Sequence, residues 1–157
     1  MRHWQVLIMA AAIQMPVVTF AQTLGYSDAD SPSEAVGMMK VKLYTAEVMK
    51  RECSARLPSK AAQMENNFNK WKTTEAHDID RANHYWAQMV GKKPEVQEML
   101  VRAEVFIKGH ISLLEQSDPD HRTQAVSVFC LQHFSDLESG IWRKRTPRLF
   151  EFLDRAP

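Results

Sequence analysis

Apolar residues recur every three or four positions through most of this 157-residue chain, and this spacing is the strongest constraint on its fold. Such spacing places apolar side chains on one face of a helix. No segment shows the alternation of apolar and polar residues that is typical of a half-buried strand. The sequence therefore predicts an all-α protein, an up-and-down bundle of four to five helices that ends in a short C-terminal helix.

The first helix has a clear beginning and end in the sequence. The run Ser31-Pro32-Ser33-Glu34 is typical of a helix start, because a serine can cap, a proline suits the first turn and a glutamate can complete a capping box. Pro58 is expected to end this helix, since proline disrupts the interior of a helix.

The next apolar stripe runs over residues 59–91 and leaves two interpretations open. It is either one long helix or two helices with a break near Thr73-Thr74, because threonine is a weak helix former. Glycine and proline residues then mark the remaining boundaries. They predict helices over Pro94–Gln116 and Asp118–Gly140, and a short last helix that begins at Thr146-Pro147.

The N-terminal 21 residues have the pattern of a signal peptide. A short basic start precedes an apolar run over residues 4–20, and small residues allow cleavage after Ala21. Residues 22–157 would then form a single exported helical domain, periplasmic or secreted. The alternative is an uncleaved anchor, although Pro16 and two glutamines weaken the apolar run.

The chain has two cysteines, and export would place both in an oxidising compartment. Cys53 lies on the apolar stripe of the first helix and Cys130 on that of the fourth. The even count and the export signal predict a disulfide between them. The alternative is two buried free thiols that act as small apolar residues. The Cys-x-x-Cys spacing of redox pairs and of c-type haem attachment is absent.

Histidines are the main candidates for chemistry. His77 and His84 are seven residues apart, roughly 10 Å along one helix, which is too far for one metal ion and indicates a solvent-exposed face. His110 and His133 lie on two different helices that could meet in the bundle, where metal sites are built, but the Glu-x-x-His pattern is missing. We therefore assign no metal ligand.

The sequence lacks the common motifs of catalysis and cofactor binding. The chain has no Gly-rich phosphate loop, no Gly-x-Ser-x-Gly and no His-Glu-x-x-His. No cofactor and no catalytic residue are predicted on this basis, and an enzyme is the least favoured class.

One local excess of charge stands out in a chain whose 20 basic and 19 acidic residues nearly cancel. That balance argues against a general attraction to nucleic acid or anionic lipid. The excess surrounds Trp142 and is either a solvated linker or the contact for an acidic partner protein. The candidate partner-binding residues are Trp142, Arg143, Lys144, Arg145 and Arg148.

Four short segments share their order with a known group of proteins. They are Cys53–Pro58, Phe68–Trp71, Cys130–Gly140 and Pro147–Leu153. This order resembles an uncharacterised family of small exported all-helical bacterial proteins. The resemblance implies a helical fold with one linking disulfide and brings no catalytic residues.

The sequence thus favours an exported, non-enzymatic protein-binding module, with immunity and inhibitor proteins as analogues at the level of fold only. Neither a nucleic-acid partner nor membrane insertion after leader removal is expected. The alternative function is a small-ligand or metal-binding helical carrier with a pocket between helices. His110 and His133 would be its contacts.

Overall fold

The computed structural model describes residues 28–89 and 94–155, and this part of the chain is helical without a strand. The predicted signal peptide, its cleavage point after Ala21 and the expected glycine stop at Gly91 lie outside these residues. The all-α prediction is confirmed, with more helices than expected. They are α1 (Pro32–Arg56), the 3-10 turn η2 (Pro58–Lys60), α2 (Ala61–Thr74), α3 (Ala76–Met89), α4 (Pro94–Glu115), α5 (Arg122–Glu138), α6 (Ile141–Arg145) and α7 (Pro147–Arg155).

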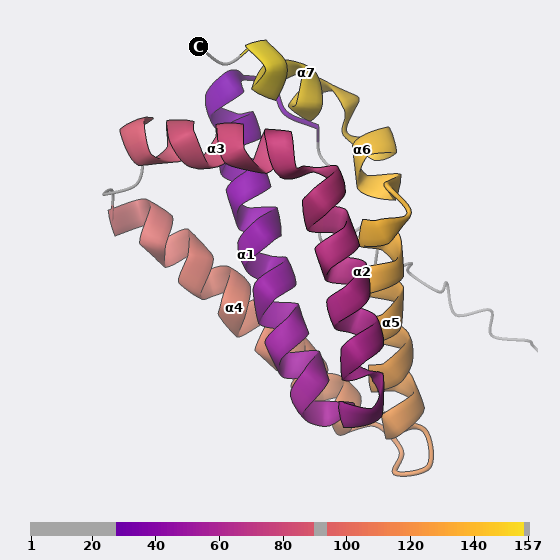
Figure 1. Ribbon diagram of the computed structural model, residues 1–157. Helices are drawn as coiled ribbons and strands as arrows, with labels where there is room; N and C mark the ends of the chain where they lie inside the picture. Colours follow the sequence, from indigo (N-terminus) through magenta and orange to yellow (C-terminus); the bar gives the residue numbers. More distant parts are fainter. Residues whose placement is uncertain (1–27, 90–93, 156–157) are drawn as a thin grey trace, which may run out of the picture.

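Helix α1 is the element around which the others are arranged, and it packs against α2, α3, α4 and α7. Figure 1 shows α1, α2 and α5 running along the length of the molecule, with α3 and α7 across one end. Helix α4 meets the bundle at its C-terminal end and diverges from α1 toward its N-terminal end (Figure 1). Among the described helices, none is long and apolar enough to cross a membrane.

The start of α1 follows the predicted cap with one difference. The Ser31 hydroxyl accepts the backbone N–H of Glu34 at 3.2 Å, as expected of a capping serine. The Glu34 carboxylate accepts the N–H of Asp30 at 2.8 Å, one residue before the position that a capping box would use. The helix ends at Arg56, two residues before Pro58.

The second apolar stripe is divided, which confirms the interpretation with a break near Thr73-Thr74. Helix α2 ends at Thr74, α3 begins at Ala76, and Glu75 between them is only 2% exposed. The break lets α3 turn across α1 (Figure 1). Glu75 is the residue that interrupts the apolar stripe, and its burial reflects an ion pair described below.

The predicted start of the fourth helix was wrong by one turn. Helix α5 begins at Arg122, because Asp118 closes a separate turn in which its carboxylate accepts the N–H of Asp120 at 3.0 Å. The predicted stop is confirmed: α5 ends before Gly140, whose positive φ of 67° favours glycine. Helix α6 follows directly and was not predicted.

The predicted disulfide is present and joins α1 to α5. Cys53 and Cys130 are bonded and fully buried, and 77 positions separate them in the sequence. They belong to a single apolar core. Its largest fully buried side chains include Met39, Met49, Met64, Phe68, Ile111, Phe134, Leu149 and Leu153.

The start of α7 is capped by a residue far away in the sequence. Asp28 accepts the backbone N–H groups of Arg148 and Leu149 at 3.0 and 2.8 Å. Thr146, directly before the helix, instead donates its hydroxyl to the carbonyl of Trp142. Burial alone would raise the pKa of Asp28, but these hydrogen bonds lower it overall. Its contribution to stability is therefore present above about pH 4 and lost as pH falls.

Replacement of Asp28 with alanine is expected to lower the free energy of unfolding by about 1 kcal/mol, because two N–H groups at the start of α7 lose their acceptor. Urea unfolding at neutral pH measures this. Asp30→Ala is the control: Asp30 pairs with Arg148 at 2.8 Å but is 77% exposed, so its loss should cost less than about 0.5 kcal/mol. Equal costs for the two variants would contradict a capping role.

Candidate functional site

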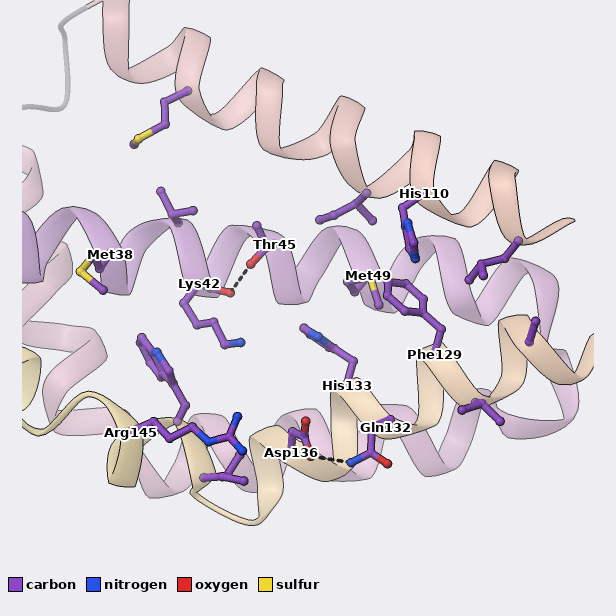
Figure 2. A pocket seen from close by; sticks show the side chains of 18 of the residues that line it. Met38, Lys42, Thr45, Met49, His110, Phe129, Gln132, His133, Asp136 and Arg145 are labelled. Carbon is purple, nitrogen blue, oxygen red and sulfur yellow. Dashed lines mark hydrogen bonds between the residues drawn. The ribbon is translucent and has the colours of Figure 1, made fainter. Parts of the chain in front are cut away.

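A groove lies between α1, α4 and α5, with α6 at one end (Figure 2). Its volume is about 1220 Å³. It exists because α4 contacts α1 and α5 through its C-terminal part and diverges from them toward its N-terminus (Figures 1 and 2). The groove is open to a ligand and draws its lining from all four of these helices.

The walls of the groove are mostly apolar. Each of the three long helices contributes, and the side chains that define the walls are Met38 and Val41 of α1, Ile107 and Leu114 of α4, and Val128 and Phe129 of α5. Val128 is 61% exposed although it is apolar. An apolar surface left open to solvent in this way is typical of a binding site.

Two basic side chains meet in the middle of the groove. Figure 2 shows Lys42 of α1 and His133 of α5 pointing toward one another. The Lys42 ammonium lies 5.6 Å from the ring centroid of Trp142, and it forms no ion pair with a described carboxylate. Burial lowers the pKa of Lys42 to about 8, against the opposing effect of the Asp136 charge.

His133 is held in its neutral form. Burial and, second, the charge of Lys42 lower the pKa of its imidazole to about 3. Its Nε2 atom is buried and has no hydrogen-bond partner among the described residues. Buried polar atoms in proteins nearly always have a partner, so this nitrogen is the unusual polar atom of the groove.

Other polar side chains also line the groove. Asp136 accepts a hydrogen bond from Gln132 at 2.6 Å, and Glu34 accepts from a backbone N–H at the start of α1. Arg145 is exposed and lines the end of the groove at α6. His110 of α4 packs with its ring centroid 4.8 Å from that of Phe129, and burial lowers its pKa.

The two histidines predicted as contacts of a pocket therefore both line the groove, although the sequence could not show it. They do not form a metal site with other described residues. The one described group with suitable geometry for a metal is His77, Asp78 and Asp154. In that group Asp78 is engaged by Arg143, and His77 is largely exposed. His84 hydrogen-bonds Gln88 at 2.9 Å.

The predicted partner-binding residues do not act together as one surface. Trp142 is only 6% exposed, and its ring packs against Trp71 and Phe150 with centroids 6.4 and 5.4 Å apart. It is therefore a core residue that also lines the groove, and its role in binding a partner stays a prediction. Helix α6 turns this side chain inward while its basic neighbours stay outside.

The four basic residues make contacts in different parts of the molecule. Arg143 pairs with Glu75 and Asp78, so it joins α6 to the junction of α2 and α3. Arg148 pairs with Asp30 at 2.8 Å, and Arg145 lines the groove. Lys144 is exposed. Two of the five candidates, Trp142 and Arg145, thus belong to the groove lining.

Lys42 is the site residue that sequence reasoning missed. A signal was present, because Met38, Lys42, Thr45 and Met49 follow one another at spacings of four, three and four, and all of them line the groove. A lysine on an otherwise apolar helix face is a recognisable irregularity. The same helix also carries the apolar stripe through Met39 and Cys53, which faces the core. That stripe alone explains the helix as a core element, so the sequence gives no separate reason to single out the Lys42 face.

Comparisons with protein-family models, with curated proteins and with solved structures found no match to this chain. The resemblance to exported bacterial helical proteins thus stays a prediction, and the function must be argued from the groove.

Proposed function

We propose that this protein is an exported, non-enzymatic binding protein that holds a small, largely apolar molecule in the groove between α1, α4 and α5. The observation that carries the proposal is a groove of about 1220 Å³ with apolar walls and a few polar groups at its centre. Small-molecule sites have this composition and usually enclose roughly 300–1,000 Å³. The larger volume suits a long or flexible molecule.

Two features support export. The N-terminal residues have a signal-peptide pattern, and the fully buried disulfide suits an oxidising compartment such as the periplasm. A carrier that binds apolar molecules is useful in such a compartment, because these molecules do not diffuse freely through water.

A glycine in the groove allows a direct test. Gly37 lines the groove, and a Cβ added there would meet no atom within 4 Å. Gly37→Trp is expected to weaken binding of the neutral fluorescent probe N-phenyl-1-naphthylamine about tenfold or more. A loss of only about 60 Å² of apolar contact would have that effect, and an indole ring covers more. Fluorescence titration measures it.

Gly109 offers a matched control. It is also a helical glycine, and a Cβ added to it would likewise meet no atom within 4 Å, but it lies on α4 outside the groove lining. Gly109→Trp is expected to bind the probe as the wild type does, and neither substitution should destabilise the helix, because glycine is a poor helix former. Saturable probe binding that both variants retain in full would contradict the proposed site.

A second candidate function is the binding of another protein. Helix α4 carries several exposed apolar side chains, which in soluble proteins often mark an interface. They are Val101, Val105, Phe106 and Leu113, between 46% and 65% exposed. The two candidate functions can be distinguished by which residues a bound molecule contacts, those of the groove or the exposed apolar residues of α4.

A further inference from the structure

We propose that the groove selects apolar molecules that end in a carboxylate, and that Lys42 and His133 hold this carboxylate. The inference rests on the groove being the binding site and adds the chemical class of its occupant. Both residues reach the middle of the groove from opposite helices, so an acidic group placed there can contact both (Figure 2).

Lys42 brings a positive charge to the middle of the groove. Its ammonium is partly buried near the face of Trp142, and no described carboxylate forms an ion pair with it, although Asp136 is close enough to act on it through its charge. A charge in such surroundings costs free energy unless it is paired. A carboxylate that enters the groove would supply the missing countercharge, while a neutral molecule of the same length would not.

His133 brings a ring nitrogen that has no hydrogen-bond partner among the described residues. A neutral imidazole donates one hydrogen bond from a ring N–H and accepts one at the other nitrogen. With its proton on Nε2, the buried atom that has no described partner, His133 can donate to a carboxylate oxygen. A ligand oxygen between Lys42 and His133 would thus satisfy both residues.

The other charges around Lys42 favour an acid with a single charge. Asp136 of α5 lies close enough to act on the Lys42 ammonium, and Glu34 of α1 also lines the groove. Arg145 of α6 is the other fixed positive charge of the lining. Because the two carboxylates offset Lys42 and Arg145, a phosphate with two negative charges is less suitable than a carboxylate with one.

Three ligands of equal chain length test the proposal on the disulfide-bonded protein: dodecanoate, dodecanol and dodecylamine. Each competes with N-phenyl-1-naphthylamine at about pH 7, where the carboxylate is ionised. Dodecanoate is expected to displace the probe at a concentration about tenfold lower than dodecanol does, because a charge-assisted hydrogen bond in a buried site is worth at least this ratio. Lys42→Met is expected to abolish the preference, so that dodecanoate and dodecanol displace the probe at about equal concentrations.

The pH dependence gives a readout that a structural role for Lys42 would not produce. The preference for dodecanoate should fall as pH rises through about 8, where Lys42 loses its proton. His133 and His110 of the lining are already neutral there, since burial lowers both pKa values, and carboxylates and guanidinium groups ordinarily titrate outside this range. Lys42→Arg is expected to keep the preference to about pH 10, because its guanidinium stays charged.

The outcomes separate this inference from the proposed function. If the probe binds but dodecanoate and dodecanol displace it equally well, or dodecylamine displaces it best, the proposed preference for a carboxylate is wrong. The groove would then remain the proposed binding site. Absence of binding by the probe, and by dodecanoate in direct calorimetry, would overturn the proposed function and this inference with it.

Discussion

Replacement of both Cys53 and Cys130 with alanine is expected to lower the free energy of unfolding by about 4 kcal/mol. The disulfide closes a long loop, because 77 positions separate the two cysteines. A cross-link over such a loop lowers the conformational entropy of the unfolded chain, and this effect corresponds to about 4 kcal/mol. It is a large fraction of the stability of a typical domain, which is about 5–15 kcal/mol. The variant should therefore unfold at a much lower urea concentration.

Chemical reduction supplies the control for this prediction. Wild-type protein that is unfolded, reduced and refolded in the presence of a reductant should have the same stability as the double alanine variant. In the native state the bond should resist the reductant, because both cysteines are fully buried. A loss below about 1 kcal/mol, or two sulfurs that react with an alkylating agent in native protein, would contradict the account of the fold.

Substitution of Arg143 is expected to have the second largest effect. Its guanidinium pairs with Glu75 and Asp78, which are 2% and 6% exposed, and it lies 3.8 Å from the ring centroid of Phe150. Arg143→Met would leave two carboxylates buried without their countercharge. Breaking a buried pair costs about 3–5 kcal/mol, and we expect about 3 kcal/mol because the Arg143 side chain is itself 45% exposed.

Two further variants test the cause of this loss in urea unfolding. Arg102→Met removes a guanidinium from an exposed pair with Glu98 and should cost less than about 1 kcal/mol. Adding Glu75→Gln and Asp78→Asn to Arg143→Met should recover part of the stability, since the uncompensated charges are then gone. An Arg143 variant no less stable than the Arg102 variant would rule out the ion pair as the link between α6 and the junction of α2 and α3.

Features that depend on a few neighbouring residues could be predicted from the sequence. The cap at Ser31, the glycine stop at Gly140 and the start of the last helix at Pro147 follow from local backbone chemistry. The disulfide was also predictable, because the predicted signal peptide and the positions of Cys53 and Cys130 on apolar stripes agreed.

Features that depend on distant residues could not be predicted. Glu75 interrupted an apolar stripe, and its partner Arg143 lies 68 positions further along the chain. From the sequence, a glutamate buried in an ion pair could therefore not be distinguished from a glutamate exposed to solvent. The same holds for Asp28, which caps a helix 120 positions away. The groove results from the angle at which α4 leaves α1, and no local pattern specifies that angle (Figure 1).

The most direct test of the binding groove is an NMR titration of the isotope-labelled protein with dodecanoate, which follows the backbone amide signal of each residue. We expect saturable changes at residues of the groove, among them Gly37, Lys42 and Val128, and none at Gly109. Changes confined to the outer apolar residues of α4, such as Val101 and Val105, or no saturable change at any residue, would contradict the account.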